Sequence, residues 1–108
     1  MKVLTRLEEI FLLSIWRLKD DAYGVSIRKA VREKAGKQMS YGALYFTLEQ
    51  LHKKGYVART EGPPTPVRGG CSKIYYSLTK TGKTLLRNTY ELQKSIWEEI
   101  SVSEFEST

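Results

Sequence analysis

The order of hydrophobic and polar residues predicts two helices in the first third of the chain. Thr5 and Glu8 have the spacing of a capping box, so the first helix is predicted to start at Thr5 and to end at about Lys19. A turn at residues 20–21 precedes the second helix. Gly36 is predicted to end that helix, because glycine readily adopts the left-handed conformation found at helix C-termini.

A third helix is predicted to begin at Ser40, which is a favourable N-cap residue. Leucines then recur with the i, i+4, i+7 spacing of a buried stripe, at Leu44, Leu48 and Leu51. Gly55 ends the helix after two lysines, whose charges favour the negative end of the helix dipole. Three short helices joined by tight turns indicate a helix-turn-helix.

The pattern changes after the third helix, where aromatic and β-branched residues predict strands over residues 56–60 and 73–78. The loop between them, residues 61–72, holds all three prolines of the chain. A last helix is predicted over residues 80–100, capped by Thr79. The fold class is therefore mainly α with a small β-hairpin, a winged helix-turn-helix followed by one C-terminal helix.

Both the first and the last helix carry more apolar surface than this short chain can cover. The first is apolar nearly all round, and the last carries two adjacent apolar stripes. A second subunit is expected to cover them. Residues 1–79 are therefore predicted to form the winged helix-turn-helix domain, which binds DNA, and residues 80–108 a dimerisation helix with an acidic tail, in one compact unit. The interface residues expected are Leu7, Phe11, Ile15, Leu86, Tyr90, Ile96, Trp97 and Ile100.

The charge of the chain is concentrated in its middle. The 108 residues carry a net charge of +6, which is modest for one small domain. Residues 28–54 hold seven basic and two acidic side chains, residues 55–83 hold five and one, and residues 84–108 hold two and five. A clustered positive charge is typical of a surface that binds a polyanion, most commonly nucleic acid. The alternative is a solvated basic surface without a partner.

Other classes of protein find little support in the sequence. The longest apolar run, residues 10–13, is too short to span a bilayer, and no secretory leader is visible. A single cysteine favours a cytoplasmic location. No catalytic constellation or phosphate-binding loop is present, so we expect neither an enzyme nor a cofactor. Cys71 with His52 is too small a set for a zinc site, and Cys71 is either a surface cysteine or a redox switch.

Three segments of the sequence resemble the PadR family of bacterial transcriptional regulators, in particular its short members with a single C-terminal helix. They are Tyr23–Ile27 at the start of the second helix, Ser40–Val57 over the third helix, and Gly69–Gly82 over the second strand. Two positions depart from the family pattern. Phe46 stands where proline is frequent, and Cys71-Ser72 stands where arginines are usual, which weakens the transfer of a phosphate-binding role to the wing.

The exposed side of the third helix is expected to enter a groove of duplex DNA, with nearby cations on phosphates. The resemblance also implies that Tyr23 contacts the DNA backbone. Tyr45 belongs either to this surface or to the core. The predicted DNA-binding residues are Tyr23, Lys37, Ser40, Tyr41, Gly42, Ala43, Phe46, Thr47, Gln50, Lys53, Arg68 and Lys73.

The resemblance implies a homodimeric, sequence-specific repressor that occludes a promoter at an inverted-repeat operator. It also implies a site for a flat aromatic effector between the subunits, for which the candidates are Phe11, Trp16, Tyr90 and Trp97. Plain packing of the dimer core is the alternative role of those aromatic residues. The rival function is a winged-helix module that docks a protein instead of DNA, since fold alone does not decide function.

Overall fold

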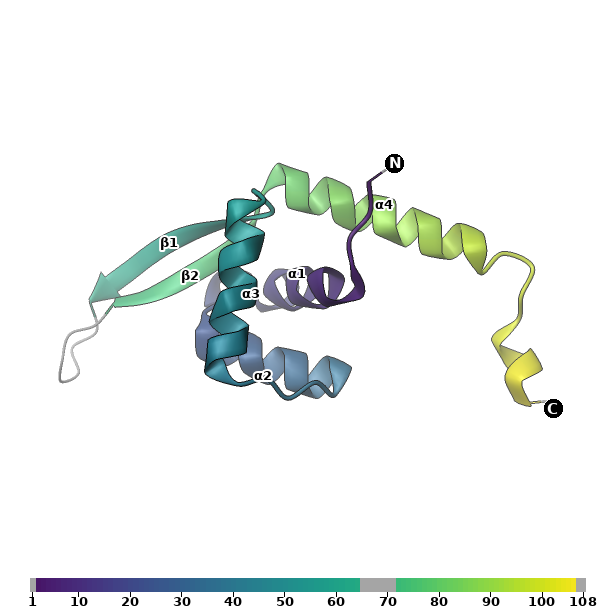
Figure 1. Cartoon of the computed structure of the whole chain (residues 1–108), viewed down its shortest axis with the longest axis horizontal. Coiled ribbons are helices and arrows are strands. Elements are labelled where there is room, and N and C mark those ends of the chain that lie inside the picture. The colour runs from purple at the N-terminus through teal and green to yellow at the C-terminus, as the bar shows by residue number, and fades with distance from the viewer. Residues whose placement is uncertain (1, 65–71, 107–108) are drawn as a thin grey trace.

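The computed structural model describes residues 2–64 and 72–106 and confirms the winged helix-turn-helix (Figure 1). The hairpin projects from one side of the first three helices, and the last helix runs along their top and past them, so the chain is 57 Å long (Figure 1). The elements are α1 (Arg6–Leu18), η1 (Lys19–Asp21), α2 (Gly24–Ala35), α3 (Tyr41–Lys53), β1 (Val57–Pro64), β2 (Ser72–Leu78), α4 (Lys80–Ile96) and η2 (Val102–Glu106).

The core lies between α1, α2 and α3. The predicted leucine stripe of α3 is confirmed, because all three leucines are buried. The other large side chains that are fully buried in the core are Phe11, Leu12, Ile15, Ile27, Val31 and Val57. Burying each of these larger side chains contributes about 1.5–3 kcal/mol, so this cluster holds the three helices together.

The capping box at the start of α1 is confirmed. The Thr5 hydroxyl accepts a hydrogen bond from the Glu8 amide at 3.2 Å, and the Thr5 amide donates to the Glu8 carboxylate at 2.9 Å. Lys54, just after α3, also donates to this carboxylate at 2.6 Å. Burial alone would raise the pKa of Glu8, but the hydrogen bonds from Lys54 and from Thr5 outweigh it and lower the pKa below its ordinary value. Glu8 therefore caps α1 and ties it to the end of α3.

We predict that Glu8→Gln lowers the free energy of unfolding at pH 7 by about 1 kcal/mol or less. The lowered pKa of Glu8 means that its stabilisation is present above the ordinary glutamate pKa of about 4.3 and is lost as the pH falls through the folded-state value. The difference in free energy of unfolding between variant and wild type should therefore be smaller at pH 3 than at pH 7, as measured by urea unfolding. Glu91→Gln, at an exposed carboxylate of α4, is the control and should change stability little; a gap that stays constant with pH would contradict the prediction.

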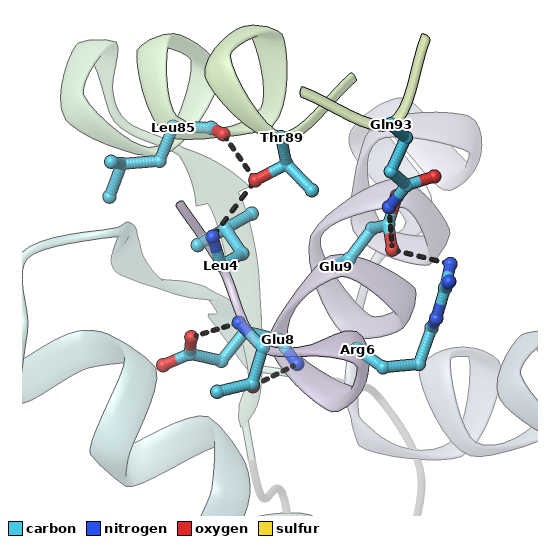
Figure 2. Close-up of polar contacts among 8 residues, drawn as sticks. Leu4, Arg6, Glu8, Glu9, Leu85, Thr89 and Gln93 are labelled. Atoms are coloured by element: carbon cyan, nitrogen blue, oxygen red, sulfur yellow. Dashed lines mark hydrogen bonds and ion pairs between the residues drawn. The ribbon is translucent and has the colours of Figure 1, made fainter. Parts of the chain in front are cut away.

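α4 is held by the N-terminal segment and by α1 as far as Gln93. The Leu4 amide donates to the Thr89 hydroxyl at 2.8 Å, and that hydroxyl donates to the Leu85 carbonyl at 2.8 Å (Figure 2). The Gln93 amide group donates to the Glu9 carboxylate at 3.0 and 3.1 Å (Figure 2). Beyond this point the helix leaves the rest of the chain and projects outward (Figure 1).

Two predicted boundaries are wrong. The last helix ends at Ile96 and not at Ile100, because Glu98 and Glu99 oppose the negative end of the helix dipole and Glu99 takes a positive φ of 68°. The first strand of the hairpin continues to Pro64, where a loop was predicted from residue 61, since Glu61 still pairs with Ile74 of β2. The wing therefore extends further from the helices than the sequence predicted.

Candidate nucleic-acid interface

The predicted DNA-binding surface is the outward side of α3. The Ser40 hydroxyl caps this helix by accepting from the Ala43 amide at 3.1 Å. Gly42, Ala43 and Phe46 are exposed, while Gln50 is half-buried. Since the leucine stripe faces the core, the structure places the predicted α3 residues on the side open to a ligand, and the two smallest of them allow a close approach.

The Thr47 side chain is oriented by its own helix. Its hydroxyl donates to the Ala43 carbonyl at 2.9 Å, one turn earlier. The hydroxyl hydrogen is therefore engaged within α3. Its oxygen lone pairs and its methyl group are the parts of Thr47 left to meet a ligand.

A groove of about 600 Å³ lies between the start of α2 and the hairpin, and Tyr45 of α3 also lines it. Tyr23 from the start of α2 and Lys73 from β2 line it together, and the Lys73 ammonium lies 4.3 Å from the centre of the Tyr23 ring. Tyr75 supports that ring from the edge, with the ring centres 5.7 Å apart. Two predicted phosphate-contacting residues 50 positions apart in the sequence are thus neighbours at one site.

An ion pair joins the wing to the recognition helix. Arg59 of β1 donates to the Glu49 carboxylate of α3 at 2.8 Å. This pairing offsets a negative charge that would otherwise repel phosphates beside α3. Burial raises the pKa of the nearby Tyr76 phenol, although Arg59 opposes the shift, so Tyr76 is neutral at pH 7. Glu49 and Arg59 were not predicted as a pair, because nothing in the sequence of two separate elements signals that they meet.

Tyr45 lies at the edge of the core and not inside it. The residue is 48% exposed, and its hydroxyl end abuts Gly24 of α2, where an added Cβ would collide with it. The ring also stacks on Tyr41 at 6.3 Å between centres. Arg28, expected from the sequence only to contribute positive charge, joins this cluster from α2.

Of the remaining predicted phosphate-contacting cations, the structure describes two and leaves one out. Lys37, between α2 and α3, and Lys53, at the end of α3, are both exposed. Arg68 lies outside the described residues, as does Cys71.

Across residues 2–64 and 72–106, no group of three or more His, Cys, Asp or Glu side chains is placed to hold a metal ion. In the same part of the chain, no helix has the length and hydropathy required to cross a membrane.

A second groove, of about 560 Å³, lies between α1 and α4. Trp16 and Tyr90 both line it, together with Leu13 and Leu86. Of the four aromatic residues predicted to form an effector site, these are the two that the structure brings together. Trp97 lies at the end of α4, where its ring meets the edge of Phe105 with 6.0 Å between ring centres.

The placement of Phe11 and Ile15 at an intersubunit surface is wrong. Their side chains are 0% and 1% exposed in the single chain, because the inward side of α1 is filled by the helices of its own domain. The outward side of α1 instead presents Leu13 and Trp16, which sequence reasoning did not assign to the interface. Leu86 is also nearly covered, while Tyr90 and Ile96 are more than 60% exposed.

The fold and the charge around α3 define a winged-helix DNA-binding protein, and comparison with known families is consistent with that class. The profile of the transcriptional regulator PadR-like family matches residues 12–88. The chain belongs to this family of DNA-binding transcriptional regulators, as the resemblance indicated. A comparison with curated proteins finds no match.

Solved structures of regulators share this architecture. A PadR family transcription regulator from hypervirulent Clostridium difficile R20291 is 30% identical, with a TM-score of 0.60 over 86% of this chain and 88% of that one. A PadR-like regulator from Bacillus cereus ATCC 14579 is 20% identical, with a TM-score of 0.65 over 83% and 82%. A Streptococcus transcriptional regulator is 24% identical, with a TM-score of 0.67 over 87% of each chain. The last two likenesses concern the fold alone.

Proposed function

We propose that this regulator is a homodimeric repressor that reads an inverted-repeat operator with α3 and clamps its backbone with the hairpin. The observation that supports this most directly is the joining of Tyr23 and Lys73 at the groove beside α3. A phosphate that follows the edge of a major groove would meet these two residues while α3 lies in the groove. Two-fold symmetry would set the two recognition helices one turn of DNA apart, about 34–36 Å.

The residues divide by the part of DNA they would meet. Phe46 and Gln50 project from the middle of α3, where apolar contact with a thymine methyl and hydrogen bonds to adenine are the available interactions. Lys37 precedes α3 and Lys53 is its last residue, so they lie near its two ends, where the strands of a groove would pass. Repression would follow from occlusion of the promoter.

The test is a pair of variants on the same helix. We expect Gln50→Ala to weaken the free energy of binding by about 1–3 kcal/mol on the preferred sequence and by little on random DNA, because it removes a base contact. Lys53→Ala should weaken binding about equally on both, because phosphates carry no sequence information. Fluorescence anisotropy with a duplex selected from a random library, and with a scrambled duplex, measures both. Equal losses for Gln50→Ala would contradict base reading, and a wild type that selects no sequence would favour the protein-docking alternative.

We also propose that residues 80–108 serve mainly in dimerisation. The exposed apolar side chains of the second half of α4 continue the apolar lining of the α1–α4 groove. Those on α4 itself and just beyond it are Tyr90, Leu92, Ile96, Trp97 and Ile100. A second copy would cover this surface and form the wall that the groove lacks.

The same groove would hold a flat aromatic effector at the dimer interface. Lys83 and Arg87 border it, and the Lys83 ammonium lies 5.6 Å from the centre of the Trp16 ring. The Glu9 carboxylate also borders the groove, but the two cations outnumber it, and this net positive rim favours an aromatic anion. We predict that anthracene-9-carboxylate binds more tightly than the cation proflavine, by about tenfold, and that Trp16→Leu weakens its binding. Calorimetric titration of both compounds checks this, with Trp97→Leu as the comparison variant; equal binding by wild type and Trp16→Leu would contradict it.

A further inference from the structure

Arg28 and two tyrosines form a ladder along the outer edge between α2 and α3. The Arg28 guanidinium lies 4.5 Å from the centre of the Tyr41 ring, which is the first residue of α3. Tyr41 in turn stacks on Tyr45, one turn further along, with an angle of 24° between the ring planes. Because the hydroxyl end of Tyr45 abuts Gly24, α3 contacts α2 at two points one turn apart on each helix.

Arg28 also holds the backbone that leads into α3. Its Nε donates to the Met39 carbonyl at 2.7 Å. Met39 is buried and immediately precedes the N-cap Ser40, so this carbonyl lies outside the hydrogen bonding of the helix itself. Hydrogen bonds from a charged donor are stronger than neutral ones, and stacking on an aromatic ring adds to them. One side chain thus fixes both the entry to α3 and its first residue.

We propose that Arg28 is a positioning residue that sets the first turn of the recognition helix and thereby the sequence specificity of the protein. The inference rests on the proposed DNA-reading function. Arginine suits this role because its planar guanidinium stacks flat while Nε donates sideways, and lysine has no equivalent of that fork. Arg28→Lys therefore preserves the charge and removes the geometry. A residue that only contacts phosphate would tolerate this exchange.

The first experiment needs no DNA. The Ala43 and Leu44 amides bond to the Ser40 side chain and carbonyl at 3.1 and 3.0 Å, so they report on the first turn of α3. In hydrogen exchange followed by NMR, Arg28→Lys should speed exchange at these two amides by about tenfold and leave the last turn of α3 unchanged. Tyr41→Leu should do the same, and Tyr41→Phe, which keeps the ring, should not. Unchanged protection at both amides in Arg28→Lys would overturn the positioning role.

The second experiment measures specificity. On the duplex selected by the wild type, Arg28→Lys should bind about tenfold more weakly, while its affinity for a scrambled duplex and the salt dependence of that affinity stay at wild-type values. Arg32→Lys, at an exposed arginine one turn further along α2, is the matched control and should bind both duplexes as the wild type does. If Arg28→Lys binds the selected duplex as tightly as the wild type, or loses affinity equally on both duplexes, the positioning role of Arg28 is overturned while the proposed function stands. A wild type with no sequence preference overturns the proposed function itself.

Discussion

Raising the salt concentration from 50 to 200 mM should weaken binding of the protein to its operator by roughly 10³–10⁵-fold, because a dimer of this size would neutralise about six to ten phosphates. Each neutralised phosphate releases condensed counterions, and the cost of recapturing them grows with the logarithm of the salt concentration. The source of the effect is the surplus of cations in residues 28–83, of which Lys37 precedes α3, Lys53 ends it and Lys73 lies in β2.

Single lysine variants locate this electrostatic contribution. Lys53→Ala and Lys73→Ala should each make the negative slope of log K against log salt shallower by about 1–2, since a dimer loses two contacts worth about 0.9 each. Lys94→Ala, at an exposed lysine in the last turn of α4, is the control and should leave the slope unchanged. Anisotropy titrations at four or five salt concentrations give these slopes. A wild-type slope shallower than about −2 would contradict phosphate-dominated binding.

The features that the sequence predicted well depend on residues close together in the chain. The Thr5–Glu8 capping box needs one turn of helix, and the turn that ends α2 needs only Gly36, whose φ is 65°. The order of helices and strands then defined the winged helix, because few other folds place a hairpin after a helix-turn-helix.

The features that the sequence did not predict depend on which surfaces meet in three dimensions. Apolar periodicity marked Phe11 as buried, but it could not distinguish burial by the same chain from burial by a partner. The contacts of Tyr23 with Lys73 and of Arg28 with Tyr41 join separate elements, and each needs the packing angle of those elements. A charge count registers Arg28 as one more cation of the middle segment, whereas its contacts make it part of the support for α3.

The double substitution Tyr90→Glu and Ile96→Glu should convert a dimer into a monomer of the chain mass, 12.4 kDa, in sedimentation equilibrium. Both side chains are more than 60% exposed in the single chain, so a carboxylate at either position remains solvated in the monomer. In the proposed dimer the same carboxylates would be buried on an apolar surface without partners, at a cost of several kcal/mol. Val102→Glu, an equally exposed apolar position in η2, is the control and should remain dimeric.

The monomeric variant should bind the full operator much more weakly than the wild type but bind a single half-site with nearly unchanged affinity. A dimer binds the second half of an inverted repeat as an intramolecular step, which typically adds a factor of about 10²–10⁴ to the affinity. The double variant should lose this factor on the full operator, while its affinity for a duplex with one half-site stays within about twofold of the wild type on the same duplex. The half-site is spared because neither Tyr90 nor Ile96 belongs to the core cluster that holds α1, α2 and α3 together. A variant that stays dimeric would contradict the proposed interface, and one that loses the half-site as well would show that α4 supports the DNA-binding domain directly.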